Sequence, residues 1–300
     1  MIKTLPMNAN EFIEQQLNER LKDLERVLKC DALTFVGNIV GGVDDVIRNV
    51  IEQKRQVSEG QNKLTVFLTT LGGYIEVVQR IVDTLRHHYD IVDFVVPNYA
   101  FSGGTVFVMS GDSIYMDYYS RLGPIDPQLE RPGGRSVPAL GYLTQWERLL
   151  KKARAGNITL PEVQLMIEGF DQAELFQYEQ ARELSVSLLE EWLVKYKFKN
   201  WKRTQTHGKK VTKAMKKQRA SAIARELNNI ERWHVHGYGI SMEVLRRDLK
   251  LLIDDFGQNS ALSAKIKQYH TLLDDYMTKM SQKGVLHTVG IYRPFLKEVG

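Results

Sequence analysis

The chain has 300 residues, 43% of them hydrophobic, which is typical of a globular protein with a sizeable core and excludes disorder of the whole chain. Its single cysteine, Cys30, excludes an internal disulfide and a multi-cysteine metal site, and it favours a reducing compartment. No uncharged apolar run approaches the roughly 18 residues that span a bilayer, and the N-terminus lacks the apolar stretch of a signal peptide. We therefore predict a soluble, cytoplasmic protein.

The net charge of +5 originates in one segment. Residues 195–219 contain eleven lysines and arginines and no acid, so the remainder of the chain is mildly acidic. The simplest interpretation of Lys195–Arg219 is a solvated helix face or a subunit contact. An acidic partner or anionic lipid is the second interpretation. Nucleic acid is disfavoured, because no nucleic-acid motif accompanies the lysines.

Residues 10–30 carry apolar side chains at helical spacing, which predicts an amphipathic helix that packs on its own domain or on a neighbouring subunit. From residue 32 to about residue 129, short β-branched and aromatic runs alternate with helical patterns. The predicted strands are Leu33–Val36, Leu64–Leu68, Ile91–Val96 and Ser113–Met116, and the predicted helices are Val43–Gln56, Tyr74–His88 and Ser102–Gly111. Alternation at this spacing predicts right-handed βαβ units on a mainly parallel sheet.

Beyond residue 128 the pattern is mostly helical. The predicted helices are Leu140–Ala155, Leu160–Ile167, Gln172–Tyr196, Lys209–Glu231, Met242–Ile253 and Ser260–Met280, with an irregular tail after the last of them. We therefore divide the chain into four parts. These are an N-terminal helix (1–31), an α/β core (32–130), a helical region that completes the core and contributes oligomer contacts (131–258), and a C-terminal helix with its tail (259–300).

Two glycine-bearing turns each follow a buried strand. Thr69–Tyr74 follows the second strand and Ala100–Thr105 the third, and in a parallel sheet both emerge at the carboxyl edge, where open α/β sheets bind ligands. A serine at the first turn of a helix exposes its hydroxyl, and backbone N–H groups of both turns can converge on one oxyanion, so the pair suits acyl transfer. Phosphate binding is the competing interpretation, but neither G-x-x-x-x-G-K-[ST] nor G-x-G-x-x-G occurs.

Four motifs in the same order resemble the serine dehydrogenase proteinase family, a branch of the Clp protease and signal peptide peptidase A superfamily. They are Phe67–Gly73, Val95–Thr105, Gly111–Met116 and Ser120–Gln128. The resemblance is close over residues 35–128 and looser in the helical remainder, where Trp233–Ile240 is similar to the family's His-Gly stretch. It implies an α/β fold of the Clp/crotonase type, a spiral of ββα units with a mainly helical C-terminal region, and a homo-oligomer.

By position, the resemblance implies that Ser102 is the nucleophile of a serine peptidase and that the N–H groups of Gly73 and Gly103 form its oxyanion hole. The general base is open. Asp126 stands where Clp subunits carry their histidine, and an aspartate alone is a poor base because its usual pKa lies near 4.

Two kinds of base remain. His236, or its neighbour His234, would form a triad with Asp126 in which the two roles have exchanged positions along the chain. Signal peptide peptidases use a serine–lysine dyad instead, for which Lys151 or Lys152 would supply the amine. A purely structural Asp126, bonding the backbone of its proline-rich turn, also stays open. We predict no cofactor and no metal, since His234 and His236 have no third ligand at suitable spacing.

The predicted function is that of a serine endopeptidase of the Clp or signal peptide peptidase type, acting on a protein or peptide substrate through an acyl-enzyme on Ser102. The alternative is a catalytically inactive Clp-fold scaffold or partner-binding subunit, which the missing histidine at position 126 favours. A crotonase-like acyl-CoA enzyme is a third class, and it would use the paired N–H donors without needing Ser102.

Overall fold

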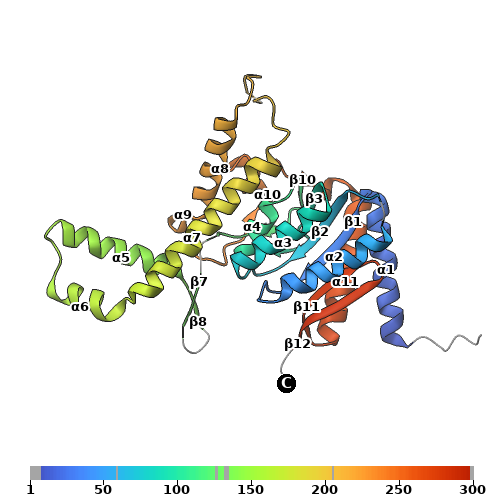
Figure 1. Ribbon diagram of the computed structural model, residues 1–300, viewed down its shortest axis with the longest axis horizontal. Helices are drawn as coiled ribbons and strands as arrows, with labels where there is room; N and C mark the ends of the chain where they lie inside the picture. The colour runs from blue at the N-terminus through green and yellow to red at the C-terminus, as the bar shows by residue number, and fades with distance from the viewer. Residues whose placement is uncertain (1–7, 59, 126–127, 132–134, 205, 298–300) are drawn as a thin grey trace, which may run out of the picture.

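The computed structural model describes residues 8–58, 60–125, 128–131, 135–204 and 206–297. These residues form a seven-stranded sheet in the order β10-β5-β3-β2-β1-β11-β12 (Figure 1). The strands are β1 (Asp31–Val36), β2 (Lys63–Thr69), β3 (Ile91–Val95), β5 (Ile114–Met116), β10 (Asp254–Asp255), β11 (Gln282–Thr288) and β12 (Ile291–Lys297). The first five run parallel, whereas β11 pairs antiparallel with both β1 and β12.

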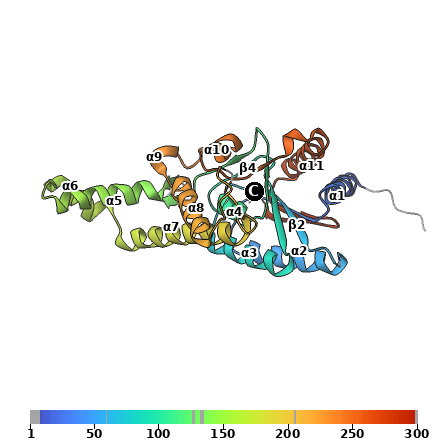
Figure 2. The same ribbon diagram turned by 90° about the horizontal axis from the view of Figure 1, so that it is seen from above.

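Helices cover both faces of this sheet (Figure 2). One layer contains α2 (Val43–Val57), α3 (Ile75–His88) and α4 (Gly103–Met109), and the other contains α1 (Ala9–Leu28) and α11 (Ser260–Lys279). Because both faces are buried, the strands are almost continuously apolar and their side chains alternate between two cores. Val66 and Leu68 point into the core under α2 and α3, while Phe67 packs into the core under α1 and α11.

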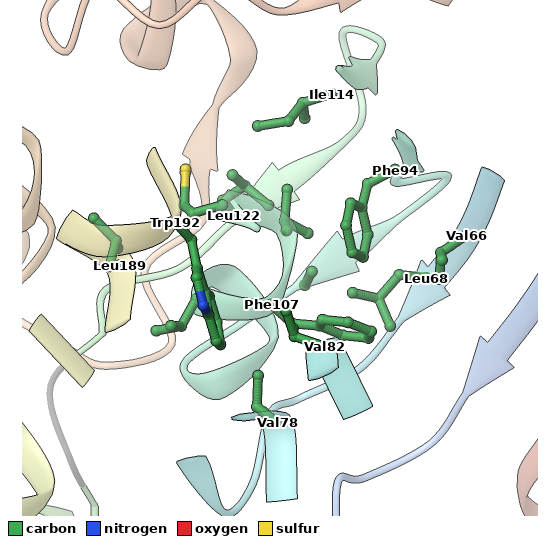
Figure 3. Close-up of a cluster of buried hydrophobic side chains, with 14 of the residues drawn as sticks. Val66, Leu68, Val78, Val82, Phe94, Phe107, Ile114, Leu122, Leu189 and Trp192 are labelled. Carbon is green, nitrogen blue, oxygen red and sulfur yellow. The ribbon is translucent and has the colours of Figure 1, made fainter. Parts of the chain in front are cut away.

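The first of these cores anchors α4. Phe107 of α4 meets Phe94 of β3 edge to face, with 4.8 Å between the ring centroids. Figure 3 shows these rings in one cluster with side chains of β2 and α3 and with Trp192 of the long helix α7 (Gln172–Trp192). Every residue of α4 is buried, so the turn that precedes this helix sits on a rigid support.

The elements outside the large sheet and its two helix layers are mostly helices. They include α5 (Ala139–Arg154), α6 (Leu160–Gly169), α7, a π-helix (Leu193–Lys197), α8 (Lys213–Leu227), α9 (Ile230–Trp233) and α10 (Met242–Arg247), together with the hairpin β7 (Gln128–Arg131) and β8 (Arg135–Pro138) and the 3₁₀ turn Phe256–Gln258. In both Figure 1 and Figure 2, α5 and α6 extend far from the sheet as an arm. No helix among the described residues is both long and apolar enough to cross a membrane.

The prediction of an α/β fold with a helical C-terminal region is confirmed, and all predicted elements of residues 33–116 are present within a few residues of the expected bounds. The predicted helix Lys209–Glu231 is shorter than expected, because Lys210 pairs with Arg203 in an antiparallel bridge and Thr212 caps α8. The four-part division of the chain stays a prediction. Its first and last parts share one core, in which Leu21 of α1 and Ile266 of α11 are buried.

The expected irregular tail after residue 280 is wrong. The chain instead forms the hairpin of β11 and β12, which extends the sheet beyond β1. Pro294 lies in β12, the edge strand, where a missing N–H is tolerated. Gly284 lets the hairpin close on Phe295, since a Cβ at this position would approach the ring to 2.6 Å.

Candidate active site

A small three-stranded sheet gathers the candidate residues. Within the described chain, β4 (Tyr99–Ala100) pairs in parallel with β6 (Arg121–Leu122), and β6 pairs antiparallel with β9 (Ile240–Ser241). Ser102 follows β4 by two residues, and His236 precedes β9 by four. The chain segments that carry Ser102, Gly123 and His236 are therefore neighbours, although more than 130 residues separate the first from the last.

Ser102 occupies an unusual backbone conformation at the start of α4. Its φ of 52° and ψ of −123° lie outside the regions that non-glycine residues prefer, and its side chain makes no capping bond to the helix. Such conformations cost about 1–3 kcal/mol and are concentrated at functional sites. A strained strand-to-helix turn is also how α/β-hydrolases expose a nucleophilic serine above a sheet. The residue is half-buried, so its hydroxyl remains within reach of a ligand.

The two glycine turns interlock, which confirms the prediction that they are neighbours. The N–H of Phe101 donates to the carbonyl oxygen of Thr70 at 3.0 Å, and the N–H of Thr70 donates to that of Tyr99 at 3.1 Å. A Cβ at Gly103 would lie 2.7 Å from the carbonyl oxygen of Gly73. Only residues without a side chain permit this approach.

Two backbone donors remain beside Ser102. Within the described residues, the N–H groups of Gly73 and Gly103 have no hydrogen-bond acceptor. By contrast, the N–H of Gly72 donates to Thr70 Oγ1 at 3.0 Å and that of Tyr74 to the carbonyl oxygen of Ile39 at 3.0 Å. Unpaired N–H groups are rare in native proteins, and two such donors close to a serine are what an oxyanion hole requires.

Thr105 ties the serine turn to the segment that leads toward Asp126. Its buried hydroxyl lies 2.8 Å from the carbonyl oxygen of Ala100 and 3.0 Å from that of Gly123, and it accepts the N–H of Gly123 at 3.0 Å. The buried Ile125 donates its N–H to the carbonyl oxygen of Leu227 at 3.0 Å. Asp126 follows Ile125 directly and lies outside the described residues.

The two candidate histidines lie in the turn between α9 and β9. His236 is half-buried, whereas His234 is exposed and has a φ of 62°. Burial distinguishes the two, because only His236 is partly withdrawn from solvent. In the described part of the chain, no three His, Cys, Asp or Glu side chains come together as metal ligands would.

The candidate lysines lie on α5, in the projecting arm (Figure 1). Lys151 and Lys152 are both exposed, and Lys152 pairs with Glu162 of α6 at 2.5 Å. This ion pair holds the pKa of Glu162 down to about 2, with the hydrogen bond from Lys152 as the largest cause. A catalytic lysine needs a desolvated amine, and neither lysine has one in this arrangement.

Sequence reasoning did not single out His270. Its Nε2 lies 3.2 Å from Thr69 Oγ1 at the end of β2, directly before the first glycine turn, and burial lowers the pKa of its imidazole. It lines a cavity of about 390 Å³ together with Asn98 and Tyr118. Nothing in the local pattern of α11 distinguishes this residue from any other histidine on an amphipathic helix.

Comparison with known proteins bears on this site. A family model described as ClpP-like SDH-type serine proteinase matches residues 43–209, which include Ser102 and both glycine turns. Two proteins of Methanocaldococcus jannaschii are similar in sequence. Uncharacterized protein MJ1495 is 25% identical over 173 residues, covering 56% of this chain and 54% of its own. Uncharacterized protein MJ0137 is 30% identical over 136 residues, covering 42% and 46%. The chain thus spans about half the length of the curated relatives it matches.

Solved structures of Clp proteases are similar in part. ClpP1 from Listeria monocytogenes superimposes with a TM-score of 0.41 at 11% identity, over 80% of this chain and 94% of that one. The ClpP protease catalytic domain from Plasmodium falciparum superimposes with a TM-score of 0.30 at 12% identity, over 41% of this chain and 63% of that one.

Proposed function

Because the chain belongs to the family of ClpP-like SDH-type serine proteinases, as its four motifs predicted, we propose that it is a serine endopeptidase that cleaves peptide bonds through Ser102. The observation that carries the proposal is the strained backbone of Ser102 beside the two unpaired N–H groups of Gly73 and Gly103. A nucleophile and two oxyanion donors are the parts that acyl transfer requires.

The reaction follows from these positions. Ser102 Oγ attacks the scissile carbonyl carbon as its proton passes to the base, and the carbonyl electron pair becomes an oxyanion held by the N–H groups of Gly73 and Gly103. Collapse of this intermediate breaks the C–N bond, and the amine leaves with the proton from the base. Water then attacks the ester in the same way and releases Ser102.

His236 is the base in this proposal, and Asp126 orients it. Two observations support the pairing. The lysines of the dyad alternative lie exposed on the arm, and β6 and β9 pair with Leu122 opposite Ile240. The imidazole of His236 would accept the proton, which an aspartate alone does poorly. Asp126 beside it would raise the proton affinity of the imidazole, because the carboxylate stabilises the imidazolium that forms.

The test is covalent labelling with a fluorophosphonate followed by peptide mass spectrometry. We expect a single adduct on Ser102, and none in Ser102→Ala, whereas Ser187→Ala, a change at an exposed serine of α7, labels like the wild type. The wild type and Ser187→Ala should also cleave casein, and Ser102→Ala should not. An unlabelled wild type would favour the scaffold alternative, which is consistent with one observation: Ser102 Oγ has no hydrogen-bond partner among the described residues.

A homo-oligomer belongs to the same proposal. The arm exposes large apolar side chains, among them Leu160 at 86% and Ile167 at 76%, and such surfaces on projecting helices mark protein contacts. Light scattering coupled to size exclusion tests the oligomeric state, and a monomeric mass would be the contrary result.

A reducing, cytoplasmic location remains a prediction. It agrees with Cys30, whose thiol is buried and has its pKa raised to about 11, chiefly by that burial.

A further inference from the structure

The fold divides the eleven cations of Lys195–Arg219 into two groups. Four contact other residues of the protein, two of them, Lys195 and Lys199, at its surface. Lys197 and Lys199 bond to Asp112, Arg219 bonds to the carbonyl oxygen of Leu249, and Lys195 lies 4.0 Å from Glu191. The other seven are Lys202, Arg203, Lys209, Lys210, Lys213, Lys216 and Lys217, and none of them forms an ion pair with a described acid.

Four of these seven line one pocket beside the start of α8. The pocket has a volume of about 500 Å³, and its walls are Trp201, Lys202, Arg203, Lys210, Val211 and Lys216. No acidic side chain is among these lining residues. A volume of this size is typical of small-ligand sites.

Two of the four cations of the pocket are held in place by neutral groups. Arg203 Nη1 donates to the carbonyl oxygen of Gly208 at 3.0 Å, and Lys216 Nζ donates to that of Lys199 at 3.0 Å. A backbone bridge between Arg203 and Lys210 closes the hairpin that carries both side chains. These two carbonyl oxygens fix Arg203 and Lys216 without neutralising them, so the like charges of the pocket repel one another until an anion enters.

We propose that this pocket binds a compact polyphosphate anion, either a nucleoside triphosphate or inorganic triphosphate. Three or four negative charges must fit within about 500 Å³ to match the four cations. A phosphate chain carries that charge on a few consecutive atoms, whereas an acidic peptide distributes its carboxylates over separate residues. Three lysines and one arginine match phosphate oxygens as point charges and as a bidentate fork, respectively.

Trp201 favours a nucleoside triphosphate over inorganic triphosphate as the ligand. Its ring packs against Phe198, with centroids 5.6 Å apart, and Trp201 is the one aromatic among the described residues that line the pocket. An indole face beside phosphate-binding cations suits stacking of a nucleobase. A nucleoside triphosphate should therefore bind more tightly than inorganic triphosphate, and Trp201→Leu should remove that difference while leaving inorganic triphosphate binding nearly unchanged.

The experiment is calorimetric titration of the full chain with inorganic triphosphate, with ATP in metal-free buffer and with a hexaglutamate peptide, at low salt. We expect triphosphate binding that weakens about tenfold or more in Lys202→Gln and Lys210→Gln, because each removes a charge-assisted bond. Lys217→Gln is the matched control, since it removes the same charge from the same segment outside the pocket, and its affinity should stay within about twofold of the wild type.

Three results would overturn the proposal: triphosphate that does not bind, hexaglutamate that binds more tightly than triphosphate, or an equal loss of affinity in Lys217→Gln and Lys210→Gln. The last would indicate a diffuse electrostatic surface. Ser102→Ala should bind triphosphate like the wild type, and Lys210→Gln should label at Ser102 like the wild type. The pocket and the peptidase can therefore fail independently.

Discussion

Gly72 lies directly against Ser102. A Cβ placed at Gly72 would approach Ser102 Cβ to 2.8 Å and the carbonyl oxygen of Phe101 to 2.6 Å, and the φ of Gly72 is +104°. The first glycine turn therefore sets the position of the serine as well as supplying an N–H donor. This contact joins two turns that are 30 residues apart in the chain into one site.

Gly72→Ala should disable the site without unfolding the protein. The methyl group must displace Ser102 or the Gly73 turn, so we expect fluorophosphonate labelling to slow at least about tenfold. Gly290→Ala is the matched control, since Gly290 also has a positive φ, +91°, but a methyl group added there would meet no atom within 4 Å. Equal labelling of both variants would show that the contact at Gly72 is unimportant for Ser102.

His236→Ala should slow labelling of Ser102 by about 10²–10⁴-fold, because general-base catalysis contributes this much. His234→Ala, Lys151→Ala and Lys152→Ala should each label at nearly the wild-type rate. The measurement is the labelling rate by intact-protein mass spectrometry, with circular dichroism to verify folding. If His236→Ala still labels and Lys151→Ala does not, the general base is Lys151 and the site is a serine–lysine dyad.

Asp126→Asn distinguishes an orienting carboxylate from a structural one. If Asp126 stabilises the imidazolium, its amide should reduce the labelling rate by up to about 10⁴-fold while the melting temperature changes little. A carboxylate that only bonds its own turn gives the opposite pattern, in which the melting temperature falls and the rate per folded molecule is unchanged.

Thr105→Val should loosen the serine turn. Valine has the shape of threonine but leaves the carbonyl oxygens of Ala100 and Gly123 and the N–H of Gly123 without this partner, which costs about 1–3 kcal/mol per buried group. We expect a lower free energy of unfolding in urea and slower labelling. Thr105→Ser retains the hydroxyl and should restore most of both. A Thr105→Val variant as stable as the wild type would contradict the role assigned to this hydroxyl.

The buried imidazole of His287 makes stability depend on pH. Its ring lies 2.7 Å from the hydroxyl of Tyr269, and burial lowers its pKa from 6.5 to about 3. Below pH 6.5 the unfolded chain binds a proton that the folded chain rejects, so the free energy of unfolding should fall as pH falls from 6.5 toward 3, by at most about 1.4 kcal/mol per unit from this group.

Urea unfolding at about pH 7 and about pH 5 measures this slope. His287→Gln should have a shallower slope than the wild type, and a change at the exposed His207, His207→Gln, should leave it unchanged. His270 contributes in the same direction, since burial lowers its pKa as well. A wild-type stability that does not vary between these pH values would contradict the effect of burial on His287.

The core could be predicted from the sequence because its signals are local. Strands such as Leu64–Leu68 are apolar throughout, since helices cover both faces, and the amphipathic stripes of α2 and α3 read directly as helices. The hairpin of β11 and β12 could not be predicted in this way. Its strand β11 pairs with β1, about 250 residues earlier, and no local pattern indicates such a distant partner.

The α/β core, the two glycine turns, the serine of the second turn and the excess of cations in one segment can all be recognised from the order of residues. How these parts are arranged in space follows from the fold. Three features depend on neighbours far away in the chain: the φ of Ser102, the lack of an acceptor for the N–H groups of Gly73 and Gly103 among the described residues, and the separation of ion-paired lysines from those that line the pocket. The physical reason is that hydrogen-bond satisfaction and charge neutralisation are properties of contacts in space, which apolar periodicity along the chain does not specify.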